Sequence, residues 1–161
     1  MKIVRALATG AAAGAAGTTA LNTLTYLDIA WRARPASNTP EATVEKLATV
    51  TGIKIPGNHE ERTNRLAGLG PLTGLVVGVG VGTVLGLARE AGYRPGLRGS
   101  SLAAAAGALL GSNGPMTVLG ITDPRTWSPT DWASDILPHL AYGIVTGAAL
   151  QALNPAPSHT L

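Results

Sequence analysis

Two side chains near the C-terminal end of the chain have the types and spacing for acid–base chemistry. Asp135 and His139 stand four residues apart in an apolar segment, so a helix places them on one face. A histidine beside a carboxylate can titrate near neutral pH. Ionisable groups at membrane depth cost free energy, so their presence there indicates a function. We expect one polar cluster at this end of a helical bundle, formed by Asn22, Asp28, Asn113, Asp135 and His139, with Ser112 beside it.

A structural interpretation of the same residues is the one we favour. Asp135 would cap its helix, Asp28 would pair with Arg32 one turn later, and His139 would bond a nearby backbone carbonyl. The sequence leaves both interpretations open.

No other pattern predicts a catalytic, cofactor-binding or metal site. The chain has no cysteine, and its three histidines are widely separated, which argues against a metal set. Gly78-x-Gly80-x-Gly82 lacks both a preceding strand and the full dinucleotide fingerprint. We therefore predict no enzyme activity, no cofactor and no metal. The net charge of +3 is too small to indicate a nucleic-acid partner.

A glycine repeat between residues 70 and 86 indicates which kind of helix positions the polar side chains. Glycine recurs there at every fourth position, which forms one face of a helix. In water each helical glycine costs up to about 1 kcal/mol relative to alanine. In lipid the backbone must bond within its own segment, and small residues let a second helix approach closely. The repeat predicts a packed transmembrane helix through Gly70, Gly74, Gly78, Gly82 and Gly86.

Glycines at the same spacing occur in three further apolar segments. With 45% hydrophobic and 13% charged residues, the composition favours one membrane domain. We predict an all-α fold over residues 1–161, an integral membrane bundle of four transmembrane helices at about 6–30, 66–88, 100–120 and 135–153. The other helix-packing glycines are Gly10, Gly14, Gly107, Gly111, Gly143 and Gly147.

The first segment also fits a cleaved signal peptide, because Lys2 and Arg5 precede a run of small residues with Ala-x-Ala triplets. We disfavour this alternative because the run is weakly hydrophobic and continues to Leu27.

Two interruptions are expected along the chain. The loop 31–65 should hold a short surface helix at about 40–51, with Pro40 at its first position and Gly52 past its end. Ser112 to Pro115 should break or kink the third span.

The distribution of charge predicts the orientation of the four spans. Five cations share the side of the termini and seven share the other side, but the second set is spread over a long loop and accompanies eight of the nine acids. Weighting the cations by their density near the span ends places both termini in the cytoplasm.

Two stretches resemble the YagU-like inner-membrane proteins. One is Leu119-Gly-Ile-Thr-Asp-Pro followed by Trp132 and Ser134-Asp-Ile-Leu-Pro-His-Leu-Ala-Tyr-Gly143, and the other is the first span ending at Arg34-Pro35-Ala36-Ser37. The resemblance implies a multi-pass protein of the bacterial inner membrane, from a group associated with acid tolerance, and it brings no catalytic residues. Asp135 and His139 fall on the family's acid–histidine pair, although the family has Glu where this chain has Asp135.

Three classes of function follow. The first is a structural or interaction protein in the lipid bilayer that associates with itself or with a larger membrane complex. The second is a small transporter, channel or proton-linked acid-stress protein that uses the polar cluster. An enzyme is the third and least supported.

The orientation can be tested with topology reporters. Fusions after Leu161 and between Gly92 and Gly96 should both report the cytoplasm, because both positions lie on the side with the denser cations. A fusion active only in the periplasm at either position would rule out the orientation with both termini inside.

Overall fold

The computed structural model describes residues 2–154, which form five α-helices, one short 3-10 helix and no strand. The all-α class predicted from the sequence is confirmed. The helices are α1 (Lys2–Arg32), α2 (Thr39–Thr51), α3 (His59–Glu90), α4 (Leu97–Val118) and α5 (Pro129–Leu153), with the 3-10 helix η1 (Pro124–Thr126) before α5.

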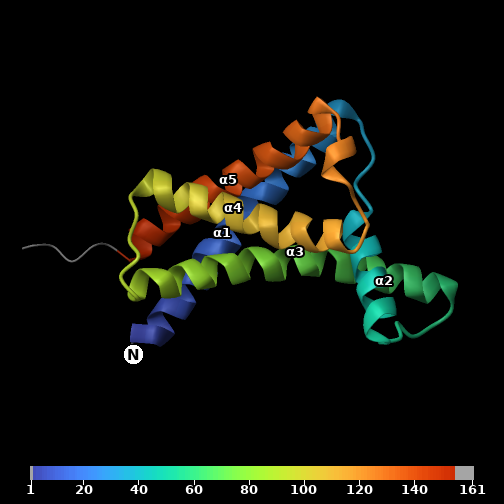
Figure 1. Ribbon diagram of the computed structural model, residues 1–161, viewed down its shortest axis with the longest axis horizontal. Coiled ribbons are helices and arrows are strands. Elements are labelled where there is room, and N and C mark those ends of the chain that lie inside the picture. The colour runs from blue at the N-terminus through green and yellow to red at the C-terminus, as the bar shows by residue number, and fades with distance from the viewer. Residues whose placement is uncertain (1, 155–161) are drawn as a thin grey trace, which may run out of the picture.

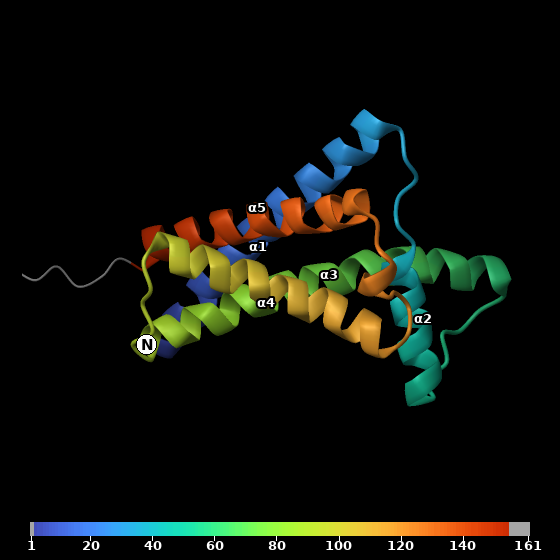
Figure 2. The ribbon, with the colours of Figure 1, turned by 45° about the horizontal axis from the view of Figure 1, so that its top comes forward.

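The four long helices form a closed ring. The helix α1 packs on α3 and α5, α5 packs on α4, and α4 returns to α3. Figures 1 and 2 show these four helices side by side, with α2 packed across one end of α3. Residue 2 and the end of α5 lie at the same end of the bundle (Figure 1). The helices thus alternate in direction, and the loops gather at two opposite ends.

Side-chain caps set the start of two helices. The Asn58 side chain accepts from the Glu61 N–H and the Glu61 carboxylate accepts from the Asn58 N–H, which is a capping box at the start of α3. Ser128 and Asp131 form the same motif at the start of α5. As a result α5 begins at Pro129, six residues before the predicted start of the fourth span, and Asp135 does not cap it.

The helix expected at 40–51 is α2, which ends at Gly52 in the left-handed conformation with φ of 72°. Its N-cap position is Asn38. An ion pair of 2.9 Å from Arg62 to Glu45 connects α2 to the first turns of α3. The short helix therefore packs against the end of the bundle.

The third span was expected to break or kink at Ser112 to Pro115, but it is not broken there. The helix α4 runs from Leu97 to Val118 and contains Pro115. Proline removes only the one hydrogen bond that residue 115 would donate to the Gly111 carbonyl, and the helix continues for three more residues. The Ser112 hydroxyl donates to the Ala108 carbonyl at 2.8 Å, which keeps its own polar group within the helix.

Glycines bring α1 and α3 into backbone contact. A Cβ atom added at Gly82 would lie 2.5 Å from Gly10 O and 2.5 Å from Gly14 Cα. In return, a Cβ at Gly14 would lie 2.5 Å from Gly78 O, and one at Gly86 would lie 2.5 Å from Ala6 O. These distances are too short for any side chain, so both helices need glycine at this crossing.

The remaining glycines of the predicted packing set have different neighbours. Gly107 and Gly111 of α4 approach Val81 and Val77 of α3, and Gly143 and Gly147 of α5 approach Ser101 of α4. Two positions of the 70–86 repeat do not contact α1, and the expectation that Gly74 packs against another helix was wrong. A Cβ at Gly70 would lie 2.9 Å from the Glu41 N of α2, and a Cβ at Gly74 would meet no atom within 4 Å. The reason is that α1 crosses α3 at an angle and leaves it before Gly74.

Tyr142 fills the space among α1, α3 and α5. Its side chain is fully buried, and its hydroxyl donates to the Gly78 carbonyl at 2.6 Å. A Cβ at Gly17 would lie 2.8 Å from the Tyr142 ring. Ala104 and Ala108 of α4 pack on the same side chain, so one tyrosine surrounded by small residues forms the centre of the core.

Two of the helices, α3 and α5, are long and apolar enough to cross a membrane. By the same measure of length and hydropathy α1 and α4 are not candidates, so the four-span bundle expected from the sequence is not confirmed. Only 17% of the most apolar stretch of α3 is buried inside the protein. Its apolar side chains therefore face outward, unlike those of a core helix in a soluble protein.

Gly82→Ala should destabilise the fold, because its methyl group meets the backbone of α1 and overpacking of this kind costs about 1–3 kcal/mol. Gly74→Ala is the matched control, since it adds the same methyl group to the same helix in open space. Thermal unfolding in mild detergent should separate the two variants. Equal melting temperatures would show that α1 and α3 are not packed backbone to backbone.

Candidate functional site

A network of four polar side chains connects α4 and α5. The Asn113 side-chain amide donates to Asp135 Oδ2 at 2.8 Å. His139 Nδ1 lies 3.6 Å from Asp135 Oδ1 and 2.7 Å from the Asp135 carbonyl oxygen. On the other side of the ring, Nε2 lies 3.2 Å from Ser112 Oγ. Neighbours on α4 therefore hold a carboxylate and an imidazole that share one face of α5.

The hydrogen bonds of His139 define its proton positions. A carbonyl oxygen only accepts, so Nδ1 carries a proton and donates to Asp135 O. Ser112 Oγ lies within reach of both Nε2 and Ala108 O. Both ring nitrogens of His139 therefore have a partner within hydrogen-bond distance.

The network is mostly buried, but part of it remains exposed to solvent. His139 is 8% exposed, and the Asp135 side chain is 19% exposed. A charged imidazole would lie beside the Asp135 carboxylate, which can balance it. Within residues 2–154 no group of three metal-binding side chains comes together. The arrangement can hold or move one proton, and it can equally fix the register of two helices.

Only part of the cluster expected from the sequence comes together. Asn113, Asp135 and His139 join, and Ser112 completes the set. Asp28 instead forms ion pairs of 3.0 Å with Arg32 and 2.7 Å with Arg34 at the end of α1. Asn22 is exposed on α1, so its expected place in the cluster was wrong. The direction in which an α1 side chain points depends on the rotation of α1 about its axis relative to α3. The glycine contact with α3 fixes that rotation and leaves Asn22 on the outer face.

The structural interpretation of the three ionisable residues fits two of the contacts. Asp28 pairs with Arg32, and His139 bonds a backbone carbonyl one turn earlier. Asp135 does not cap α5, because Ser128 does.

The loop before α5 is held by its own side chains. Arg125 forms an ion pair of 2.9 Å with Asp123, and this guanidinium lowers the pKa of the Asp123 carboxyl. The Trp127 indole donates to Thr122 Oγ1 at 2.8 Å, and its ring packs edge-on against Trp132 with ring centres 5.0 Å apart. The Leu119 to Pro124 stretch thus forms an ordered connection from α4 to the network on α5.

Comparison of the chain with models of known protein families, with curated proteins and with solved structures found no match.

Sequence reasoning missed one conspicuous residue at the opposite end of the bundle. Arg89 of α3 is 6% exposed, although arginines at the end of an apolar helix are usually solvated. In the sequence, Arg89 belongs to a short basic segment that gave no indication of burial. The burial arises because the ends of other helices meet at this residue.

Asp135→Ala should lower stability by about 1–2 kcal/mol, because it leaves the Asn113 amide without its acceptor between two helices. Asn22→Ala, which removes an exposed polar side chain, should change the melting temperature little. Thermal unfolding of both variants in detergent checks this expectation. Equal effects would mean that the α4–α5 network contributes nothing to the fold.

Proposed function

We propose that this chain is a small multi-pass membrane protein with a structural or interaction role, which associates with itself or with a larger membrane complex. The observation that carries the proposal is an unfilled apolar groove between α3 and α4. It measures about 340 Å³ and is lined by Val76, Val77, Gly80, Val81, Val84, Leu85, Ala103 and Gly107.

The groove suits another helix. In lipid, helices associate through close packing of small residues, because the surrounding tails are as apolar as the helices. Gly80 faces open space, with no atom within 4 Å of a Cβ added there. Val76 and Val84, one turn to either side, are 68% and 63% exposed. Gly80 leaves a gap between these two valines into which a partner helix can pack.

Membrane insertion of all four long helices is part of this proposal. Large apolar side chains are exposed along α4 as well as α3, including Leu102 at 64% and Leu110 at 73%. At 31 and 22 residues, α1 and α4 also have the length to cross about 30 Å of hydrocarbon. Their lower hydropathy comes from alanine, glycine, serine and threonine, which helix–helix contacts in membranes favour.

The bacterial inner membrane and relationship to the YagU-like proteins are also proposed. They are supported by the residues of the Leu119 to Gly143 stretch and of the first span's exit. The placement of both termini in the cytoplasm is supported by the separation of charge, because α1 begins and α5 ends at the end of the bundle that carries Arg89, Arg94 and Arg98.

A second candidate function, proton-linked transport or acid-stress response, is favoured by the geometry at His139. The imidazole has a partner for each protonation state in Ser112, Asp135 and the Asp135 carbonyl.

The interaction role can be tested at the groove. Gly80→Leu should weaken self-association or recovery of a partner complex by about tenfold or more, because its side chain occupies the space of the incoming helix. Gly74→Leu on the same helix also points into open space but lies outside the groove. Energy transfer between labelled copies in liposomes and co-purification in mild detergent measure the effect. A wild-type protein that stays monomeric and retains no partner would contradict the proposal.

The proton-linked role can be tested at His139. His139→Gln keeps a polar side chain but removes titration, so the variant should accumulate normally and lose proton flux in liposomes and its effect on acid survival. A normally abundant and fully active variant would remove this second candidate.

A further inference from the structure

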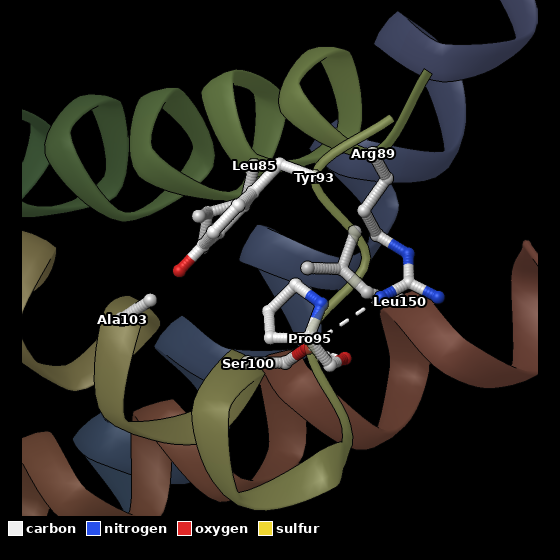
Figure 3. A pocket seen from close by; sticks show the side chains of 7 residues that line it. All are labelled: Leu85, Arg89, Tyr93, Pro95, Ser100, Ala103 and Leu150. Carbon is white, nitrogen blue, oxygen red and sulfur yellow. Dashed lines mark hydrogen bonds between the residues drawn. The ribbon is translucent and has the colours of Figure 1, made fainter. Parts of the chain in front are cut away.

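Arg89 lies where the four long helices converge, at the end of the bundle opposite the His139 network. Its Nη2 donates to the Asn154 carbonyl after α5 at 3.2 Å, and its Nη1 contacts Ser100 Oγ of α4 at 3.5 Å. The Asn154 side chain in turn donates to Thr9 Oγ1 of α1 at 2.7 Å. Figure 3 shows the guanidinium beside Leu150 and above Pro95 and Ser100. The guanidinium thus bonds to α4 and to the residue after α5, and Asn154 connects it to α1.

The guanidinium has an unused donor. Arg89 Nε is buried and has no hydrogen-bond partner, although a buried N–H of a charged group is costly to leave unpaired. Five carboxylates form ion pairs at the opposite end of the bundle, namely Asp28, Glu45, Glu61, Asp123 and Asp135. No carboxylate among them balances Arg89.

The charge around Arg89 is strongly positive. Lys2, Arg5, Arg94 and Arg98 belong to the same end of the bundle, and the one acidic side chain there, Glu90, is exposed. Arg94 donates to the Arg89 carbonyl at 3.0 Å and therefore keeps a second guanidinium close to the first. An end with five cations and one acid favours an anion from outside the chain.

A small cavity opens beside Arg89. It has a volume of about 10 Å³ and is lined by Leu85, Arg89, Tyr93, Ser100 and Leu150, among others. That volume accommodates about one oxygen atom. Pro95, which precedes α4, and Ser100, at the end of the first turn of α4, border the cavity. The N-cap of α4, Gly96, supplies no side chain to the first N–H groups of the helix, which lie between these two residues in the chain. Those N–H groups and the helix dipole favour a negative charge.

We propose that Arg89 and the N-terminus of α4 form a binding site for a phosphate group, with one phosphate oxygen in the cavity accepting from Arg89 Nε. The phosphate comes from the headgroup of an anionic phospholipid or from free inorganic phosphate. The lipid source depends on the membrane insertion proposed above, but neither source depends on self-association through the α3–α4 groove.

The alternative is that Arg89 only caps the C-terminal end of α5 through the Asn154 carbonyl, with a water molecule in the cavity. This alternative predicts no response to any phosphate compound, so the two interpretations differ in a direct measurement.

The experiment follows the Arg89 Nε–H signal by ¹⁵N–¹H NMR on the full-length protein in detergent micelles. Phosphatidylglycerol, phosphatidylcholine and inorganic phosphate are added separately, and the oligomeric state is recorded in each sample. We expect a saturable shift of this signal with phosphatidylglycerol and little change with phosphatidylcholine. The same shift with inorganic phosphate alone would identify free phosphate as the source. No shift with either anion would overturn the site, whether the protein is monomeric or associated.

Variants provide a second readout. Arg89→Gln should weaken binding of the phosphate compound that shifts the wild-type signal at least tenfold, measured by native mass spectrometry for phosphatidylglycerol or by the NMR titration for inorganic phosphate. Lys54→Gln, which changes an exposed cation of the loop at the other end, should leave that binding unchanged. Equal binding of this compound by the two variants would contradict the proposal. If Arg89→Gln does not fold, the NMR measurement on the wild-type protein decides the question.

Discussion

The backbone contact between α1 and α3 is the constraint on which the rest of the structure depends. Gly10 and Gly14 lie against Gly78, Gly82 and Gly86 at distances that exclude a Cβ atom on either helix. The close approach exposes the Gly78 carbonyl to α5, where the fully buried Tyr142 hydroxyl donates to it. Ala104 and Ala108 of α4 then pack on Tyr142. Each later helix takes its place from this first crossing.

The close packing of α4 on α5 also fixes the positions of the side chains in the polar network. Gly143 and Gly147 lie against Ser101 and, for Gly143, also against Ala105. These contacts set the antiparallel register of the two helices, and two turns further along that register Asn113 comes opposite Asp135. The hydrogen-bonded network is therefore a consequence of glycine packing near the other end of the pair.

Charge divides the molecule into two unlike ends. Eight of the nine acids lie at the end with α2 and the start of α5, where the ion pairs of the described residues also lie. The other end has five cations and one acid. A protein whose two ends differ in this way has a preferred orientation in a membrane, and its positive end attracts anionic headgroups. At the positive end, Arg89 is buried, and the phosphate site proposed there would give this attraction a specific position.

The groove between α3 and α4 also follows from the many small residues of the chain. Small residues on α3 and α4 leave a groove that no side chain of the described residues fills. Large apolar side chains on both helices are exposed beside it. Under the proposed function, lipid tails or another helix cover this face, because a large apolar groove is costly in water.

The sequence by itself determined the helical class, the presence of four long helices and the glycines that let two of them meet, because periodicity and small-residue spacing are local properties of a chain. It also placed Asp135 and His139 on one face, since residues four apart are neighbours on any helix. Tertiary structure alone decided that Asn22 faces outward, that Gly74 is open and that Arg89 is buried. Those outcomes depend on the crossing angle, rotation and register of helices that are distant in sequence, and no local pattern encodes them.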